Sequence, residues 1–347
     1  MDLYFNVPAK CLEWNRRKHL ICKEISRYNA SILCLQEVDR FDDLDGLLQK
    51  SGFQGVHKSR TGEASDGCAI FWKEKLFKLL HHQDIEFERF GLRNNVAQLC
   101  VLEMNHEDSE SKLCVQQSNS RPASTGSRRL VVGNIHVLFN PKRGDIKLGQ
   151  VRLLLEKANK LSQEWGNTPV IICGDMNSTP KSAIYEFMAS AKLDMQLHDR
   201  RQISGQFELE SIQSKQRLFR WNNRYAASAT MPISRSLSYE WTSEELRLAT
   251  GSEECTHVQH QLKLQSAYTR APGTGRTRDH LGEPLATSYH SRFLGTVDYI
   301  WHTEQLVTVR VLESLPIDEL KRSRGLPSEK WGSDHLAIAC ELAFAND

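Results

Sequence analysis

Carboxylate, amide and imidazole side chains recur where the apolar runs of this sequence end. Residues 169–180 read PVIICGDMNSTP, so Asp175 and Asn177 follow a short apolar run. Side chains two apart on an extended strand face the same way, and we expect both at the rim of a sheet if the strand lasts that far. Similar side chains close other apolar runs, at Glu37, His136, Asp298, Asp334 and His335. Together these residue types could bind a metal ion and move a proton.

Each of these positions also has an explanation that needs no function. Asp or Asn before Ser-Thr-Pro is common in turns and caps, a Glu at a strand end is often solvated, and the adjacent Asp334 and His335 could be structural. Asp298 is harder to explain in this way, because it lies between Val297 and Tyr299 in an apolar run. An unpaired carboxylate is costly to bury, so we expect a histidine as its partner.

The acidic and amide side chains predict a magnesium site. Mg²⁺ binds through a few oxygen ligands and keeps waters or substrate phosphates. The candidate ligands are Glu37, Asp175, Asn177 and Asp334. Zinc is disfavoured because the sequence contains no C-x-x-C or H-E-x-x-H motif. We therefore expect Mg²⁺ as the cofactor, with Mn²⁺ as a substitute.

Two histidines would complete such a site. His136 and His335 could donate a hydrogen bond to a charged phosphoryl oxygen or act as an acid or base. An Asp beside a His fixes its tautomer and stabilises its protonated form. A metal ion, histidine donors and a carboxylate base together favour phosphodiester hydrolysis as the reaction.

Short apolar runs rich in Val, Ile and Leu predict the strands that carry these residues. The expected strands are 30–38, 67–72, 96–104, 130–138, 169–173, 296–301, 307–312 and 335–342. Helices are expected over 11–28, over 146–165, around 243–249, and after Pro180 with Thr179 as its cap. Many strands with a few helices between them favour an α/β or α+β sandwich of layers.

The chain reads as one domain with insertions. Its 347 residues are 39% hydrophobic and 25% charged, which is typical of a globular protein with a sizeable core. Residues 105–129 contain few apolar side chains and are predicted to be a mobile loop. Residues 200–285 are polar and irregular, and are predicted to be an insertion between strands.

Charge and cysteine usage bear on partners and location. The net charge is only +2, so a nucleic-acid signal must be local. Basic residues flank the His136 strand, at Arg121, Arg128, Arg129, Lys142, Arg143 and Lys147. No apolar run approaches the ~18 residues of a membrane span, and MDLYFNVPAK lacks the apolar core of a secretory signal. Nine cysteines without a C-x-x-C pair favour a reducing compartment, and we expect the cytoplasm, with the nucleus as a second location.

The motifs LQEVD, GDMNSTP, GTVDYIW and SDHLAI, in that order, resemble the endonuclease/exonuclease/phosphatase superfamily. The resemblance covers nearly the whole chain, so that residues 1–347 are expected to form a single catalytic domain. It implies a four-layered α/β sandwich with two central mixed β-sheets flanked by helices.

Further segments narrow the resemblance. DGCAIFWK (66–73), NIHVLFNPKRGDIKLGQ (134–150), LKLQSAY (262–268) and YHSRFLGTVDYIW (289–301) resemble the carbon-catabolite-repressor-type deadenylases, especially the plant homologues, with the Angel proteins as relatives. This implies a Mg²⁺-dependent 3′–5′ exoribonuclease that removes poly(A) from mRNA and releases AMP. Two other hypotheses stay open: an RNA 2′,3′-cyclic phosphatase of the Angel kind, and an RNA-binding protein with impaired catalysis.

The resemblance also implies roles around the metal. Glu37 would hold the first metal ion, with the help of Asp334. Asp175 would orient or deprotonate the attacking water. Asn177 would contact the scissile phosphate or a second metal ion.

The remaining roles concern the phosphate and the base. His335 would stabilise the pentavalent phosphorus with Asp298 behind it, and His136 would be a phosphate-facing donor. Pro141 and Phe293 would flank the adenine base. Stacking on an aromatic ring tolerates any base, so Phe293 alone cannot specify adenine.

Two departures from the family pattern modify these expectations. The leucine-rich repeats that precede the catalytic domain in yeast and animal deadenylases are not in this sequence, so membership of the large deadenylase complex is not expected. A strand with a catalytic asparagine also precedes the segment that matches Leu3–Tyr28, and neither is found here. We therefore expect a domain without its first strand and with reduced stability and activity.

Overall fold

The computed structural model describes residues 3–105, 128–206 and 239–345. Most of the predicted mobile loop, residues 106–127, and part of the predicted insertion, residues 207–238, lie outside the described residues. No described helix is both long and apolar enough to cross a membrane.

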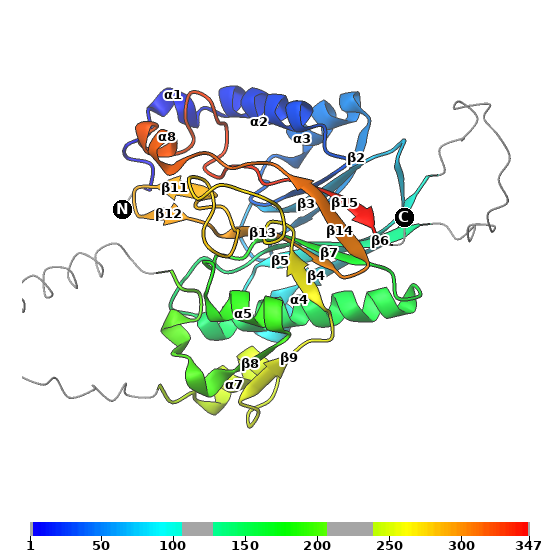
Figure 1. The fold of residues 1–347 in the computed structure, drawn as a ribbon, viewed down its shortest axis with the longest axis vertical. Helices are drawn as coiled ribbons and strands as arrows, with labels where there is room; N and C mark the ends of the chain where they lie inside the picture. Colours follow the sequence, from blue (N-terminus) through cyan, green and yellow to red (C-terminus); the bar gives the residue numbers. More distant parts are fainter. Residues whose placement is uncertain (1–2, 106–127, 207–238, 346–347) are drawn as a thin grey trace, which may run out of the picture.

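The helices lie on the two outer faces of a layered structure (Figure 1). They are α1 (Ala9–Leu12), α2 (Trp14–Tyr28), α3 (Phe41–Leu48), α4 (Gly144–Glu164), α5 (Ala183–Ser190), α7 (Ser243–Thr250) and α8 (Ile317–Arg322). Short 3-10 turns are η1 (Gln49–Ser51), η2 (Phe87–Phe90), η4 (Met195–Leu197) and η5 (Arg200–Gln202). Helices α2 and α3 cover one sheet, and α4 and α5 cover the other, which gives the predicted α/β sandwich.

The larger sheet has six strands in the order β10-β13-β7-β6-β5-β4. These strands are β10 (Leu264–Ser266), β13 (Asp298–Thr303), β7 (Val170–Asp175), β6 (Arg129–His136), β5 (Val96–Met104) and β4 (Phe77–Glu86). The sheet is mixed, because β6 and β7 are parallel while their other neighbours are antiparallel. Sequentially distant β13 thus lies beside β7, and the ends of three neighbouring strands meet at one edge.

The other strands form small antiparallel sheets. A three-stranded sheet has the order β1-β3-β2, with β1 (Ile32–Leu35), β3 (Gly67–Lys73) and β2 (Phe53–Ser59). The two-stranded sheets pair β14 (Leu306–Val311) with β15 (Cys340–Phe344), β11 (Ser288–His290) with β12 (Phe293–Gly295), and β8 (Lys192–Asp194) with β9 (His257–Gln259). In the described part of the chain β1 is an edge strand of the three-stranded sheet.

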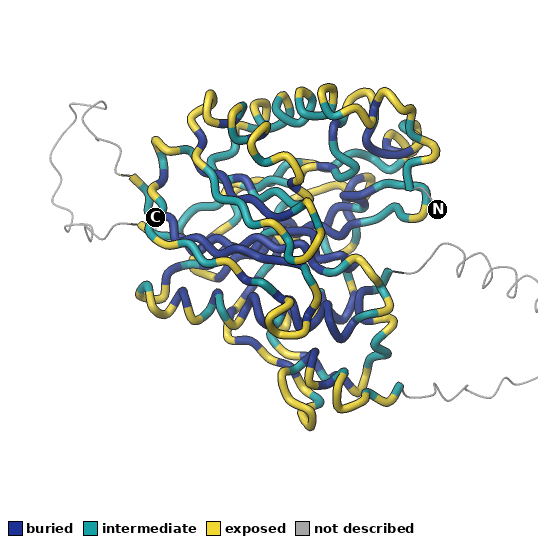
Figure 2. Tube along the Cα trace, turned by 180° about the vertical axis from the view of Figure 1, so that it is seen from behind, coloured by how far each residue is buried: buried dark blue, intermediate teal, exposed yellow. Residues whose placement is uncertain are grey.

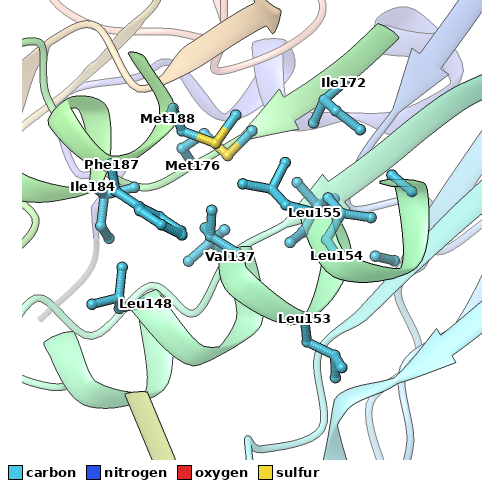
Figure 3. Packing of buried hydrophobic residues seen from close by; sticks show 14 of the residues in the cluster. Val137, Leu148, Leu153, Leu154, Leu155, Ile172, Met176, Ile184, Phe187 and Met188 are labelled. Atoms are coloured by element: carbon cyan, nitrogen blue, oxygen red, sulfur yellow. The ribbon is translucent and has the colours of Figure 1, made fainter. Parts of the chain in front are cut away.

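Apolar cores fill the spaces between the layers, as the dark central strands of Figure 2 show. One core lies between the six-stranded sheet and α4 and α5, where Leu154, Ile172 and Phe187 are fully buried. Figure 3 shows α4 and α5 side chains converging around Val137 and Met176, which are the residues just beyond β6 and β7. The packing against α4 and α5 therefore fixes the ends of β6 and β7.

The structure corrects several sequence predictions. The C-terminal strand begins at Cys340, so His335 lies in the preceding loop and only bridges to Ser288. The helix after Pro180 is capped by the Ser182 side chain, which accepts from the Tyr185 amide, and not by Thr179. The helix predicted around 243–249 is confirmed as α7.

Two long strands were not predicted, in addition to the three-residue strands β8, β9, β10, β11 and β12. The two long strands are β2 and β4, whose sequences, FQGVHKS and FKLLHHQDIE, contain several polar residues. Because β4 is the edge strand of its sheet and β2 is the edge strand of the smaller sheet, part of each faces water and the apolar run is broken.

Candidate active site

A cavity of about 230 Å³ lies at the edge where β6, β7 and β13 meet. Seven of the predicted site residues line it, namely Glu37, His136, Asp175, Asn177, Phe293, Asp334 and His335. Asp298 lies directly behind His335, to which it is hydrogen bonded. Pro141 is not among the residues that line the cavity.

Strand register brings three of these side chains together. His136 at the end of β6 is paired with Asp175 at the end of β7, and Asp298 at the start of β13 is paired with Asp175 from the other side. His136 Nε2 lies 3.6 Å from Asp175 Oδ2 and 3.9 Å from Glu37 Oε1. Burial lowers the pKa of His136, against the charge of Asp175, so the imidazole is neutral near pH 7.

The backbone beyond β7 is not extended as far as Asn177, which was the condition for Asp175 and Asn177 to face the same way. The strand stops at Asp175, and Asn177 has a left-handed φ of 44°. The Asn177 amide N–H donates to Asp175 Oδ1 at 2.7 Å, and its side-chain amide donates to the Val137 carbonyl at 2.9 Å. Glu37 is also left-handed, with φ 54°. Such conformations cost energy in residues with a side chain, and they concentrate at functional sites.

The glycine before Asp175 is required by close packing. Gly174 has φ 148°, and a Cβ atom there would lie 2.0 Å from the Ile135 carbonyl oxygen. Only glycine allows β7 to approach β6 at this point. The approach places Asp175 beside His136.

A fully buried lysine supports the same loop from α4. Lys147 Nζ donates to the Asn177 carbonyl at 2.6 Å and to Gln206 Oε1 at 3.1 Å. Burial lowers its pKa to about 7. The lysine therefore ties the loop that carries Asn177 to a helix whose neighbouring side chains are in the core.

Asp298 and His335 form a tight pair. His335 Nδ1 lies 2.8 Å from Asp298 Oδ2. Burial acts to lower the pKa of His335, but the charge and hydrogen bond of Asp298, with the Asp175 and Asp334 charges, raise it well above its usual value. The imidazole is thus protonated at neutral pH, with its other nitrogen free to donate.

The carboxylates of the cavity fit a hard divalent cation. Burial and the Asp298 charge raise the pKa of Asp175 to about 6. Asp334 accepts from the Tyr4 hydroxyl at 2.6 Å, and Glu37 lines the same cavity. Neighbouring carboxylates oppose one another's ionisation, and a bound cation removes this repulsion.

The distances between the acidic groups show which predicted ligands lie close together. Among the described residues, Asp175, Asp298 and His335 form the one group of three whose ligand atoms lie within 4.8 Å of one another. Two members of this group, Asp298 and His335, are already bonded to each other. Glu37, Asp334 and Asn177 are therefore the residues left to join Asp175 around a metal ion, and their roles stay predictions.

Sequence reasoning missed several residues that line the cavity. They include Tyr4, Arg60, Asn95, Phe139, Gln206 and His290. The ring of His290 lies 6.0 Å from that of Phe293, with their planes inclined by 35°. Phe139 could have been predicted from the sequence. It lies two residues before Pro141, in VLFNP, and an aromatic residue so close in sequence to His136 is a candidate for the same site.

Comparison with known proteins agrees with this geometry. The profile of the Endonuclease/Exonuclease/phosphatase family matches residues 4–335. The chain belongs to this family. Members of the family hydrolyse phosphodiesters or phosphate esters and are typically dependent on a divalent metal, as the acidic cavity suggests.

Similar members of the family include plant proteins. The Arabidopsis thaliana "Carbon catabolite repressor protein 4 homolog 5" is 75% identical, over 100% of this chain and 74% of that protein. Homolog 3 from the same plant is 46% identical, over 100% of this chain and 72% of its own length. These similarities match the family relatives expected from the motifs.

A solved structure in the family has the same fold. ANGEL2, described as a 2′,3′-cyclic phosphatase in complex with adenosine-2′,3′-vanadate, is 30% identical and superposes with a TM-score of 0.72. The match covers 98% of this chain and 89% of that one. The human Nocturnin catalytic domain, at 23% identity and a TM-score of 0.56, shares the fold.

Proposed function

We propose that this chain is a Mg²⁺-dependent 3′–5′ exoribonuclease that shortens the poly(A) tails of mRNA and releases AMP. One observation carries the proposal: His335, held by Asp298 at 2.8 Å, faces the same cavity as Asp175 and the aromatic side chain of Phe293. The similarity to the plant carbon catabolite repressor homologs supports it.

Hydrolysis would begin with a water molecule beside Asp175. The pKa of this carboxyl, about 6, lies near neutral pH, where a general base is effective. Asp175 would accept the proton as the water oxygen bonds to phosphorus. The bond from phosphorus to the 3′ oxygen of the upstream nucleotide breaks, and that oxygen takes up a proton, so the products are AMP and a chain shorter by one nucleotide.

The two histidines would act on the phosphate in different ways. Protonated His335 would donate to a non-bridging oxygen and stabilise the charge that develops in the transition state. Asp298 would keep the imidazole oriented and charged. Neutral His136 would contribute a hydrogen bond without a charge.

A metal ion would supply charge neutralisation when bound. Glu37, Asp175, Asn177 and Asp334 are the residues proposed to hold it, and Mg²⁺, with Mn²⁺ as a substitute, is the proposed ion. The Tyr4 hydroxyl, bonded to Asp334, would orient that carboxylate.

The terminal base would stack near Phe293. Its partly exposed ring lies at the cavity wall beside His290, so the two rings offer an aromatic surface. Pro141 lies outside the cavity lining, and its contact with the base stays a prediction. Single-stranded poly(A) RNA would be the substrate, in the cytoplasm and also the nucleus.

A second candidate function is removal of 2′,3′-cyclic phosphates from RNA ends. The observation that favours it is the similarity to ANGEL2 over nearly the whole chain. The same acid, base and phosphate donors would serve both reactions, so substrate fit decides between them.

The test uses two substrates with Mg²⁺ present or chelated. A 5′-labelled RNA that ends in a run of adenosines should give a ladder of shorter products, whereas a cyclic phosphatase leaves the length unchanged. A matched RNA with a 2′,3′-cyclic phosphate end should show loss of that phosphate if the second candidate is correct. Hydrolysis of neither would favour an RNA-binding protein with impaired catalysis and overturn the proposal.

A further inference from the structure

Arg60 places a positive charge in the cavity wall. It is the one arginine or lysine among the described residues that line the cavity. Its terminal nitrogens donate to Asn94 Oδ1 at 2.7 Å and to Asp66 Oδ1 at 3.4 Å, but its Nε is buried without a partner. A buried donor without a partner is costly, and a guanidinium is suited to a phosphate oxygen. Nε is closed off from the cavity, but the Arg60 side chain is 25% exposed, so its guanidinium is oriented in advance and keeps a face open to a phosphate.

Phe139 is the second unexplained feature of this wall. Its side chain is 55% exposed, yet it lines the cavity. Large aromatic side chains exposed at a cleft are typical of surfaces on which nucleic-acid bases stack. None of the roles assigned to the reaction uses this ring.

Hydrogen bonds connect the two features. Arg60 is bonded to Asn94, and the next residue, Asn95, donates to the His136 carbonyl at 3.1 Å. Gln150 bonds Asn95 Oδ1 at 3.2 Å and accepts from the Leu138 amide at 2.8 Å. Leu138 directly precedes Phe139 in the chain. Arg60 and Phe139 thus belong to one continuous wall.

This wall lies next to the catalytic groups and not among them. Arg60 lines the same cavity as Glu37 and His136, but its hydrogen bonds go to Asn94 and Asp66. These two bonds fix the position of the guanidinium beside the catalytic groups. This position suits a phosphate that neighbours the scissile one.

We propose that Arg60 and Phe139 form a binding subsite for the nucleotide upstream of the scissile phosphate. The base of that nucleotide stacks on Phe139, and Arg60 binds the phosphate on its 5′ side. The inference rests on the proposed exoribonuclease function and specifies its substrate: a single-stranded chain with at least two phosphates. A mononucleotide 2′,3′-cyclic phosphate does not reach this subsite.

Short oligonucleotides test the two contacts separately. The dinucleotide ApA contains the scissile phosphate and the upstream base, whereas ApApA adds the upstream phosphate. Arg60→Met should raise KM for ApApA about 10-fold or more and change KM for ApA less than about 2-fold. Phe139→Ala should raise KM for both oligonucleotides by about 5-fold or more and leave hydrolysis of adenosine 2′,3′-cyclic phosphate unchanged.

Further variants separate binding from structure. Arg60→Lys keeps the charge, so its KM for ApApA should lie between those of the wild type and Arg60→Met. Arg310→Met and Phe90→Ala are matched controls, because Arg310 pairs with Glu341 on β14 and β15 and Phe90 is 45% exposed on η2. Thermal melts confirm that each variant is folded. The subsite would be overturned if Arg60→Met raised KM equally for ApA and ApApA, or if the control variants raised KM for ApApA as much.

A binding experiment separates this proposal from the exoribonuclease proposal. Anisotropy of labelled oligo(A) is measured in EDTA, where no hydrolysis occurs. Arg60→Met should weaken binding and lower the slope of log affinity against log salt by about 0.7 to 1. Weaker binding with no tail shortening by the wild type would reject the exoribonuclease and retain the subsite. Unchanged binding in both Arg60→Met and Phe139→Ala would reject the subsite whatever the activity.

Discussion

His335 Nδ1 lies 2.8 Å from Asp298 Oδ2, and Asp298 is paired across the β13–β7 ladder with Asp175. The loop that carries His335 is therefore fastened to the strand beside the one that carries the candidate base. The same carboxylate raises the pKa of His335 and that of Asp175. The buried Asp298 thus keeps His335 protonated and brings the pKa of Asp175 close to neutral pH.

Replacing Asp298 should disturb both partners. Asp298→Asn removes the charge that stabilises protonated His335, so we expect kcat on an A-tailed RNA to fall about 100-fold or more. The measurement is kcat by single-turnover shortening, with circular dichroism to check the fold. Asp318→Asn, at an exposed position on α8, is the control and should retain full activity. A wild-type rate for Asp298→Asn would exclude the proposed pair from catalysis.

The metal site can be tested at two carboxylates. Glu37→Ala and Asp175→Ala should each abolish hydrolysis and leave the fold intact, since both line the acidic cavity. Mg²⁺ that binds only the folded wild type should raise its Tm, and this rise should be lost in both variants. If either variant keeps the wild-type rate, that residue has no role in the metal or water site.

Lys147 should matter for geometry more than for stability. Lys147→Met removes the bond to the Asn177 carbonyl, and a small displacement of this loop should cost about 10- to 100-fold in kcat. The fold should be as stable or more so, because a buried charge is replaced by an apolar side chain of similar length. Lys160→Met on the exposed face of the same helix is the control. Loss of stability without loss of kcat would make Lys147 a purely structural residue.

Glu283 provides a test of pH-dependent stability away from the cavity. It is buried and accepts from the Tyr185 hydroxyl at 2.8 Å, and burial raises its pKa to about 7. The folded state then binds more protons than the unfolded state between about pH 4.5 and 7, so this group lowers stability as pH rises through that window. The loss should reach roughly 3 kcal/mol.

Urea unfolding between pH 4.5 and 8 measures this effect. Glu283→Gln should lack the decline, so its free energy of unfolding should gain on that of the wild type as pH increases. Glu304→Gln, at an exposed position, should follow the wild-type curve. Parallel curves for Glu283→Gln and the wild type would show that this carboxyl has an ordinary pKa.

Phe293 should affect one class of substrate. Phe293→Ala should weaken turnover on A-tailed RNA by roughly 1–3 kcal/mol through lost stacking. A small phosphate ester without a base should be hydrolysed at the wild-type rate. Equal losses on the two substrates would remove Phe293 from base recognition.

The residue types of the site and most of the elements were predictable because both are local properties. The apolar runs of β3, β5, β6 and β7 are buried on both faces, so composition alone indicates them. GDMNSTP and SDHLAI mark their own positions in the sequence. The expectation of a histidine partner for Asp298 came from the cost of burying an unpaired charge, and that rule needs no coordinates.

Tertiary structure decided which of these residues meet. His335 lies 37 positions after Asp298 and outside any strand, so its place depends on the path of a loop. Arg60 follows β2 of the smaller sheet and reaches the cavity through its bond to Asn94, which precedes β5 of the larger sheet, and no local pattern encodes a contact between two sheets. Asp175 lies between His136 and Asp298 only because β7 pairs with a strand far along the chain, and strand order is set by the burial of whole faces.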